Sequence, residues 1–221
     1  MGKTAIILGA TGLTGGILLK KLMKDPSYTK IKLFSRSSVK IEDDKIEEYL
    51  IDVLQLEKYN KDFTAEEVFC CVGTTAAKTK DSSKYKQIDY GIPVAASKLA
   101  KENSIDTFVV MSSMGADATS SVFYSKTKGE MERDVLHQKI KNTYILRPSL
   151  IGGNRDEFRL GENIGKGFMS FINPFMKGGL AKYKMIHPEK IASGMQKLAK
   201  NNKNQSIFSS EEIVQIANST I

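Results

Sequence analysis

The 221-residue sequence has few residues of several types: two cysteines, two histidines, five prolines and no tryptophan. The two cysteines, Cys70 and Cys71, are adjacent, so they can form neither a disulfide framework nor a CxxC metal pair. This scarcity favours a reducing compartment, and we expect a cytoplasmic protein. No group of His, Cys, Asp and Glu has the spacing of metal ligands, so we expect no metal.

Long apolar runs are also missing. The N-terminus leads directly into a strand-like stretch without the features of a secretory signal, and the apolar stretch 167–180 is too short to span a bilayer. We therefore expect no membrane span. The 33 Lys and Arg exceed the 25 Asp and Glu, giving a net charge of +8, but the excess is scattered. A scattered excess predicts no nucleic-acid partner.

What recurs along the chain is an alternation of short apolar runs with longer amphipathic stretches. Strands are expected over 4–9, 31–35, 45–53, 68–73, 107–112 and 143–148. Helices are expected over 12–24, 84–103, 124–141 and 188–200, followed by a short strand at 207–208 and a final helix. This alternation predicts a doubly wound parallel sheet, the Rossmann fold, with helices on both faces. We expect one domain over 1–221, with the Gly- and Phe-rich stretch 152–187 as a substrate-side or lid segment.

The turn after the first expected strand has the spacing GxxGxxG. Glycines at these positions allow a tight turn, close approach of the backbone to a pyrophosphate, and close helix–strand packing. The amides at the start of the following helix would face the phosphates. The context, a strand before and a helix after, predicts a dinucleotide site. We assign to it Gly9, Thr11, Gly12, Leu13, Thr14 and Gly15.

The end of the second expected strand indicates which dinucleotide binds. Sites that prefer NAD place an acidic residue there for the ribose 2′-hydroxyl. This sequence instead has Ser35, Arg36 and Ser37, whose guanidinium and hydroxyl groups suit a 2′-phosphate, which favours NADP(H). Asp52 and Val53 end the third strand pattern and could bound the adenine, although Asp52 could equally cap a helix.

Tyr124 and Lys128 form a YxxxK pair at the start of the helix after the fifth strand. On a helix, residues i and i+4 share a face, and a nearby ammonium makes a tyrosine a usable acid or base. Ser113, at the end of the preceding strand, could orient a carbonyl or alcohol oxygen. The same spacing occurs at Tyr28 and Lys32, so the hypothesis depends on the position of the pair in the fold rather than on the spacing.

With the glycine turn, Ser113, Tyr124 and Lys128 in this order, the chain resembles the short-chain dehydrogenase/reductase superfamily. Within it, the chain is most similar to the atypical NAD(P)H-binding group of the Tat-interacting-protein type. The segments that carry this similarity are 69–75, 111–117, 128–130, 147–148 and 186–192. The resemblance implies a cofactor whose contacts include Cys71, Gly73, Thr74, Lys128 and Pro148.

The resulting hypothesis is an NADP(H)-dependent oxidoreductase acting on a small carbonyl or alcohol, with Tyr124 transferring the proton, Ser113 orienting the oxygen and Lys128 binding ribose. One alternative is a non-catalytic NADP(H)-binding regulator or redox sensor. Another is a sugar-nucleotide epimerase or dehydratase, for which the C-terminal portion is small. The stretch 168–176 is expected to form a lid or a homodimer surface, and Cys70 and Cys71 to be small core residues.

Overall fold

The computed structural model describes residues 2–74, 79–152, 185–201 and 203–220. Seven parallel strands form one sheet in the order β3-β2-β1-β4-β5-β6-β7. The strands are β1 (Lys3–Leu8), β2 (Tyr28–Ser35), β3 (Ile46–Leu50), β4 (Glu67–Cys70), β5 (Thr107–Met111), β6 (Asn142–Arg147) and β7 (Ile207–Ser209). The strand order reverses between β1 and β4, which confirms the predicted doubly wound Rossmann fold.

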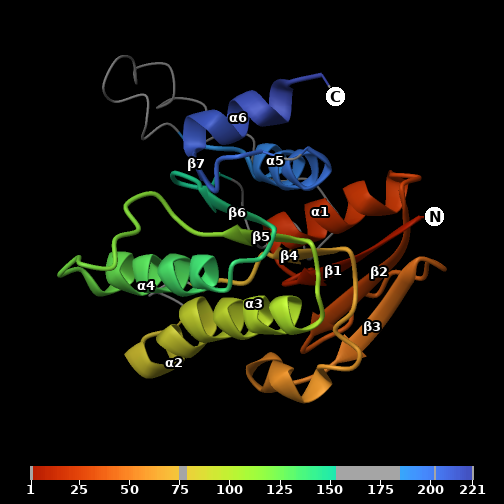
Figure 1. Cartoon of the computed structure of the whole chain (residues 1–221), viewed down its shortest axis with the longest axis horizontal. Helices are drawn as coiled ribbons and strands as arrows, with labels where there is room; N and C mark the ends of the chain where they lie inside the picture. Colours follow the sequence, from red (N-terminus) through yellow and green to blue (C-terminus); the bar gives the residue numbers. More distant parts are fainter. Residues whose placement is uncertain (1, 75–78, 153–184, 202, 221) are drawn as a thin grey trace.

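Helices cover both faces of the sheet (Figure 1). Helices α1, α5 and α6 lie on one face, and α2, α3 and α4 on the other. The helical elements are α1 (Leu13–Lys24), η1 (Val53–Tyr59), α2 (Ser82–Lys86), η2 (Gln87–Gly91), α3 (Ile92–Glu102), α4 (Phe123–His137), α5 (Pro188–Lys200) and α6 (Ser210–Asn218). Among the described residues, no helix is both long and apolar enough to cross a bilayer.

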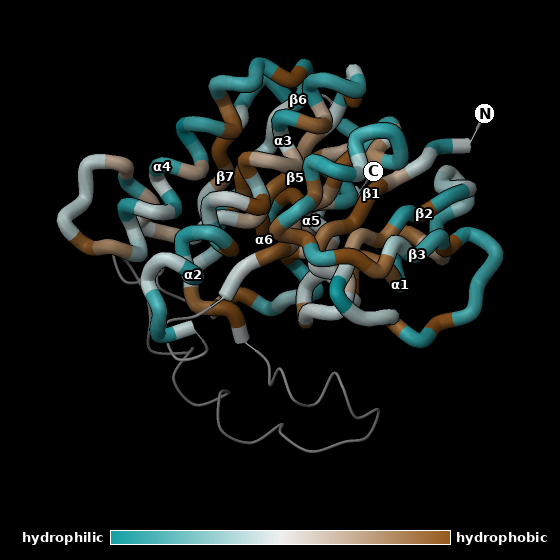
Figure 2. The backbone as a smooth tube through the Cα atoms, turned by 90° about the horizontal axis from the view of Figure 1, so that it is seen from below, coloured by the Kyte–Doolittle hydropathy of each residue, from teal (hydrophilic) through white to brown (hydrophobic). Residues whose placement is uncertain are grey.

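The strands separate two hydrophobic clusters. Because side chains alternate along a strand, Ile7 of β1 belongs to the cluster beneath α1 and α5, whereas Ile6 belongs to the cluster beneath α3 and α4. Figure 2 shows the central strands as hydrophobic and the outer loops as largely hydrophilic. Burial on both faces explains why the strand sequences are continuous apolar runs rather than alternating ones.

Several expected elements have different bounds: β2 begins at Tyr28 rather than at 31, β4 ends at Cys70 rather than at 73, and three more differ as follows. The third strand ends at Leu50 rather than continuing to 53, because the Asp52 side chain accepts a hydrogen bond from the Leu54 amide and begins the 3₁₀ helix η1. The helix expected over 84–103 starts at Ser82 and contains a π-helical turn, η2. The helix expected over 124–141 ends at His137, and Lys139 has a left-handed backbone with φ of 52°.

The expected substrate-side segment 152–187 falls mainly outside the described residues. At its two ends, Ile151 and Ile186 form a parallel bridge, and the Gly152 amide donates to the Ile186 carbonyl at 2.9 Å. The chain therefore leaves and re-enters the described fold at one place, next to the end of β6. Helix α5 then begins at Pro188, as expected, with proline in the first turn where its missing N–H costs no helical bond.

Helix α4 lies against the loop that follows β5. A Cβ added to Gly129 would lie 2.0 Å from the Ala118 amide nitrogen and 2.2 Å from the Asp117 carbonyl carbon. Both neighbours are backbone atoms, so neither can move aside cheaply. Only glycine lets α4 approach this loop so closely.

We expect Gly129→Ala to lower the free energy of unfolding by about 3 kcal/mol or more, because the added methyl group overlaps backbone atoms. Chemical denaturation measures the change. Gly91→Ala is the matched control, since a Cβ at Gly91 meets its nearest atom at 4.0 Å. The control should alter stability by less than about 1 kcal/mol. Equal stabilities for the two variants would contradict the close approach of α4.

Candidate functional site

The predicted site residues follow the carboxyl ends of neighbouring strands. Leu8 of β1 pairs with Phe34 of β2 and with Cys70 of β4, and Cys70 pairs with Val110 of β5. These parallel strands therefore end at nearly the same level. The loops that carry the candidate cofactor and catalytic residues consequently emerge along one edge of the sheet, where open α/β sheets bind ligands.

The glycine turn after β1 is built for close backbone contact. Gly9 has a left-handed backbone with φ of 87°, and the Gly12 amide donates to its carbonyl at 3.0 Å. A Cβ on Gly15 would lie 2.2 Å from the Gly9 carbonyl oxygen. Gly12 precedes α1 and supplies no side-chain cap to its amides. The turn thus brings the N-terminus of a helix, with its partial positive charge, to the sheet edge.

The other assigned residues of this turn differ in exposure. Thr14 is buried, Leu13 packs partly against the α1-side core, and Thr11 is exposed. Leu13 and Thr14 therefore help to fix the start of α1, whereas the Thr11 side chain is free to contact a ligand.

The end of β2 presents Arg36 to solvent. Ser35 is buried, and its hydroxyl donates to the Ser37 carbonyl at 2.8 Å, which holds the turn around Arg36. The Arg36 side chain is exposed. Arg36 follows β2, the strand that pairs with β1, and its role in binding a 2′-phosphate stays a prediction.

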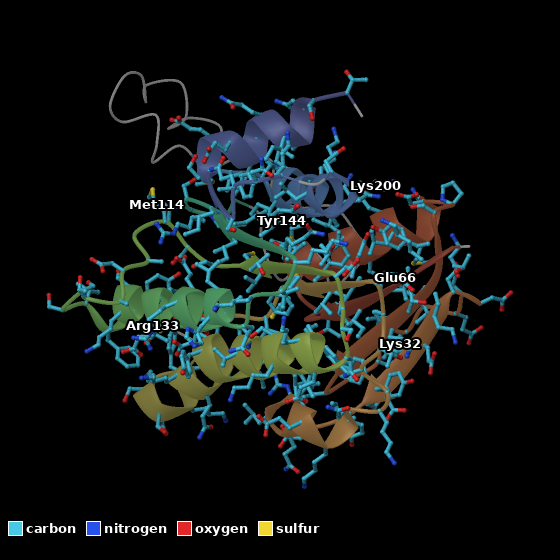
Figure 3. The ribbon with its side chains drawn as sticks, viewed as in Figure 1. Lys32, Glu66, Met114, Arg133, Tyr144 and Lys200 are labelled. Carbon is cyan, nitrogen blue, oxygen red and sulfur yellow. The ribbon has the colours of Figure 1, made fainter. Side chains whose placement is uncertain are left out.

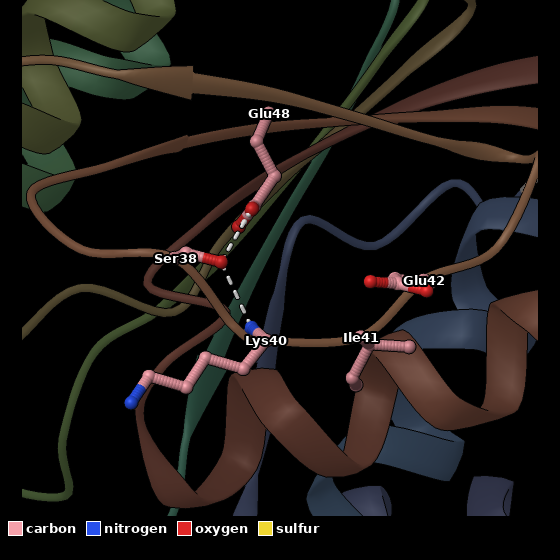
Figure 4. A pocket seen from close by; sticks show the side chains of 5 residues that line it. All are labelled: Ser38, Lys40, Ile41, Glu42 and Glu48. Carbon is pink, nitrogen blue, oxygen red and sulfur yellow. Dashed lines mark hydrogen bonds between the residues drawn. The ribbon is translucent and has the colours of Figure 1, made fainter.

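The loop after Arg36 is held by Glu48 of β3 and lines a surface cavity of about 580 Å³ (Figure 4). The Glu48 carboxylate accepts hydrogen bonds from the Ser38 hydroxyl at 2.6 Å and from the Val39 amide at 2.8 Å. The Lys40 ammonium points away from Glu48. Glu48 therefore gives the loop a defined shape rather than leaving its charge free in the cavity.

Of the two residues assigned to the adenine, Asp52 is exposed and caps η1 through the Leu54 amide, while Val53 is buried. The alternative that Asp52 caps a helix is confirmed. A role for either residue in adenine binding stays a prediction.

The three predicted catalytic residues differ sharply in their surroundings. Ser113 is buried, and among the described residues its hydroxyl oxygen has no hydrogen-bond partner. The Lys128 ammonium lies 2.8 Å from the Asp89 carboxylate, with 5% and 1% of the two side chains exposed. Tyr124, at the start of α4, is 40% exposed. The site therefore combines a buried charge pair and a buried free hydroxyl with a phenol open to solvent.

Asp89 also binds the loop after β4. Its second carboxylate oxygen accepts a hydrogen bond from the Thr74 amide at 2.8 Å. A Cβ on Gly73 would lie 3.4 Å from Asp89 Oδ1 and 3.9 Å from Lys128 Nζ. Gly73 thus lies directly against the buried charge pair, close to where the resemblance expects the nicotinamide.

Tyr85 lies beside the catalytic candidates. Its ring packs edge-on against Phe123 and Tyr124, with centroids 5.7 and 6.2 Å away. Burial, together with the negative charge of Asp89, raises the pKa of Tyr85, so its hydroxyl remains protonated at neutral pH. In the described part of the chain this buried hydroxyl, like that of Ser113, has no partner.

A second buried network fixes the strand ends that carry Ser113. Glu132 accepts a hydrogen bond from the Ser112 hydroxyl at 2.5 Å and is paired with Arg147 at the end of β6. The Pro148 carbonyl accepts from the Met114 amide at 2.9 Å. Residues 112–114 are therefore tied both to α4 and to the end of β6, which fixes the position of Ser113.

Cys70 and Cys71 are buried on opposite faces of the sheet, one in each hydrophobic cluster, as expected for small core residues. Burial raises the pKa of the Cys70 thiol to about 11 and raises that of Cys71 as well. Both remain protonated at neutral pH and are poor nucleophiles. No cluster of three His, Cys, Asp or Glu suited to a metal occurs in the ranges that the structure describes.

Sequence reasoning missed Asp89, Tyr85 and Glu132. Asp89 does have a sequence signal, because Tyr85, Asp89, Ile92 and Ala96 recur at helical spacing and all four are buried. An acidic residue within such an apolar stripe needs a partner. The stretch 168–176, expected to form a lid or a homodimer surface, lies outside the described residues.

Comparison with known proteins identifies the family. Residues 9–157 match the model of a family described as NAD(P)H-binding. A protein named FMP52-1, mitochondrial, from Scheffersomyces stipitis is 34% identical over 176 residues, covering 77% of this chain and 77% of the relative. A rat protein named HTATIP2 is 31% identical over 183 residues, covering 81% of this chain and 75% of the relative.

The expectation of a cytoplasmic protein is overturned by these relatives. Those from Scheffersomyces stipitis, Candida albicans and Meyerozyma guilliermondii all carry mitochondrial in their names. The inference failed because scarce cysteine argues only against an oxidising environment and does not distinguish one reducing compartment from another.

Solved structures agree on the fold. UDP-glucose 4-epimerase from Thermotoga maritima, determined with UDP-glucose, has a TM-score of 0.68 at 13% identity and covers 97% of this chain and 81% of its own. MoeE5 in complex with UDP-glucose and NAD has a TM-score of 0.67 at 15% identity, covering 97% and 80%. At such low identity the likeness shows the Rossmann architecture alone. Together with the family match and the sequence relatives, it shows that the chain belongs to the NAD(P)H-binding family, among the atypical short-chain dehydrogenase/reductases.

Proposed function

We propose that the chain is an NADP(H)-dependent oxidoreductase that acts on a carbonyl or alcohol through Ser113, Tyr124 and Lys128. The observation that carries the proposal is the buried Ser113 hydroxyl, which lacks a partner among the described residues. Leaving a buried hydroxyl unpaired costs about 1–3 kcal/mol. Such a cost is understandable where a ligand oxygen completes the hydrogen bond.

The residues at the sheet edge fit a dinucleotide. Gly9, Gly12 and Gly15 form a cradle whose last glycine cannot carry a side chain, and the uncapped amides of α1 suit a pyrophosphate. The exposed Arg36 suits a 2′-phosphate, which supports NADP(H) over NAD(H). Gly73 leaves room above the Asp89–Lys128 pair. A bound nicotinamide would supply the hydride chemistry.

Each catalytic candidate has a role that its surroundings support. Ser113, whose hydroxyl has no partner in the ranges that the structure describes, donates a hydrogen bond to the reacting oxygen. Tyr124, half open to solvent at the start of α4, gives or takes the proton at that oxygen. Lys128 is held by Asp89 and binds a ribose hydroxyl. The protein thus orients the reacting groups and moves one proton.

A second candidate function, a nucleotide-binding regulator without turnover, is favoured by one observation. The Lys128 ammonium is paired with the Asp89 carboxylate, which offsets the positive charge that would otherwise act on Tyr124. In that case the same cofactor residues bind NADP(H), but Tyr124 makes no contribution to any reaction.

We expect Tyr124→Phe to lower turnover against a panel of carbonyl substrates by about 10²- to 10⁴-fold, because proton transfer is lost. NADPH binding, measured by calorimetry, should persist. Tyr90→Phe is the control. The Tyr90 hydroxyl in η2 donates to Asp134 of α4 at 2.7 Å, so this change also removes a phenol hydroxyl that lies against α4. Tight NADPH binding without turnover in the wild-type protein would support the regulator instead.

We expect Arg36→Ala to weaken NADPH binding by about 10- to 100-fold, because a charge-assisted contact to the 2′-phosphate is removed. The affinity for NADH, which lacks that phosphate, should stay nearly unchanged. Arg133→Ala is the control, because Arg133 is exposed and lies on α4, across the sheet from α1 (Figure 3). Equal losses for NADPH and NADH would rule out the assignment of Arg36.

A further inference from the structure

The hydroxyl of Tyr85, in α2, is buried and has no hydrogen-bond partner in the part of the chain that the structure describes. The side chain is only 3% exposed, yet it belongs to neither of the two hydrophobic clusters that flank the sheet. A buried polar group without a partner costs stability. Phenylalanine would fill the same space without that cost, so stability gives no reason for a hydroxyl at this position.

Two other buried tyrosines show what this fold does with a phenol that serves structure. The Tyr28 hydroxyl, at the start of β2, donates to the Glu67 carboxylate at 2.6 Å. The Tyr144 hydroxyl, in β6, accepts from the Lys203 amide at 3.0 Å. Buried tyrosines usually find such a partner. Tyr85 departs from this pattern, and it does so beside the predicted catalytic residues.

The surroundings of Tyr85 place it at the start of α4. Its ring packs edge-on against the rings of Phe123 and Tyr124, the first two residues of that helix, with centroids 5.7 and 6.2 Å away. Figure 1 shows α2 next to this end of α4. Burial first, and then the negative charges of Asp89 and Tyr124, raise the pKa of the Tyr85 hydroxyl. The hydroxyl therefore lies close to both of these residues.

This hydroxyl is suited to binding rather than to proton transfer. Because its pKa is raised, it keeps its proton at neutral pH and donates a hydrogen bond. In the proposed function, Ser113 and Tyr124 both act on the reacting oxygen of the substrate. The Tyr85 hydroxyl is thus left for a different oxygen of the same small molecule.

We propose that Tyr85 is a substrate-binding residue, whose hydroxyl donates a hydrogen bond to a second oxygen on the carbon next to the reacting carbon. The substrate class is then that of diketones, hydroxyketones and vicinal diols. This inference rests on the proposed function, because it names the substrate class of that same site. The contact between the Tyr85 and Tyr124 rings sets the two phenols side by side, which suits two oxygens on neighbouring carbons.

The remainder of the substrate meets apolar side chains. Val122 and Phe123, which directly precede Tyr124, are both large and exposed. Contiguous exposed apolar residues mark binding surfaces more often than isolated ones do. The side chains around the Tyr124 phenol therefore favour a substrate with a hydrocarbon body, such as a six-carbon ketone.

The first experiment measures NADPH-dependent reduction of 2,3-hexanedione and of 2-hexanone, which lacks the second oxygen. Tyr85→Phe should lower kcat/KM for the diketone by about 10-fold, because one hydrogen bond is lost. For 2-hexanone the loss should be less than about twofold. Each substrate is compared between variants, so the greater intrinsic reactivity of the diketone cancels.

Tyr90→Phe is the matched control, because it removes a phenol hydroxyl in η2 that is bonded to Asp134 instead. It should leave kcat/KM for both ketones near the wild-type values. Unchanged reduction of the diketone by Tyr85→Phe, or an equal loss with both ketones, would overturn the proposal.

The cofactor is the other molecule that this hydroxyl could contact, and its affinity distinguishes the two. If Tyr85 binds substrate, the dissociation constant of NADPH in Tyr85→Phe should stay within about twofold of the wild-type value. A loss of NADPH affinity as large as the loss in kcat/KM would assign the hydroxyl to the cofactor and refute the substrate contact.

Thermal unfolding of the protein without ligands tests whether the hydroxyl has a structural role. Tyr85→Phe removes an unpaired group, so its Tm should equal or exceed that of the wild type. Tyr28→Phe removes a buried hydrogen bond to a carboxylate and should lower Tm by about 2 °C or more. An equal fall in both variants would show that the fold itself needs the Tyr85 hydroxyl, contrary to the proposal.

A binding measurement separates this inference from the proposed function. If the wild-type protein reduces neither ketone, the proposed oxidoreductase function fails for this substrate class. Calorimetry with 2,3-hexanedione and the NADP⁺-loaded protein, which has no hydride to transfer to a ketone, then decides the inference. Binding that is about 10-fold weaker in Tyr85→Phe sustains the role of Tyr85. Equal binding by both proteins, or no binding by the wild type, refutes it.

Discussion

The site depends first on parallel strand pairing with aligned carboxyl ends. Leu8, Phe34, Cys70 and Val110 pair across four neighbouring strands, so the loops that follow them all emerge at one edge. At that edge, α1 starts directly behind β1, because Gly15 packs onto the Gly9 carbonyl with no space for a Cβ. This contact brings the amides at the start of α1 to the edge of the sheet, the place where open α/β sheets bind ligands.

Helix α4 is the second organising element. Its inner face carries Lys128 and Glu132, two charged residues one turn apart, each buried and paired with a residue from another element. Lys128 reaches η2, and Glu132 reaches the ends of β5 and β6. Gly129 lies between them and allows the helix to touch the loop after β5. Buried charges tolerate little displacement, so these pairs fix α4 relative to the strand ends.

Two buried hydroxyls, those of Ser113 and Tyr85, have no partner within the described part of the chain, and both fit this arrangement. Ser113 and Tyr85 are buried near the same helix, while neighbouring polar groups such as Ser112 and Asp89 are paired. Since most buried polar groups in folded proteins have partners, an exception beside a rigid charge network is a natural place for a ligand atom. The charge network thus holds the site rigid, and the Ser113 hydroxyl offers a hydrogen bond that a ligand can complete.

Local patterns were sufficient to predict much of this protein. Apolar runs between helical periods predicted the doubly wound sheet, Pro188 marked the start of α5, and the glycine spacing indicated the turn after β1, because strand, helix and turn preferences act over a few neighbouring residues. The bounds of β3 and the π-helical turn escaped prediction, since they depend on the Asp52 cap and on the packing around Asp89. The pairing of Lys128 with Asp89, and of Glu132 with Arg147, joins groups 39 and 15 residues apart and exists only once the helices pack on the sheet. The sequence by itself determined the architecture and the family; the tertiary structure decided which charges meet, because burial makes each of them require a partner that only the assembled fold supplies.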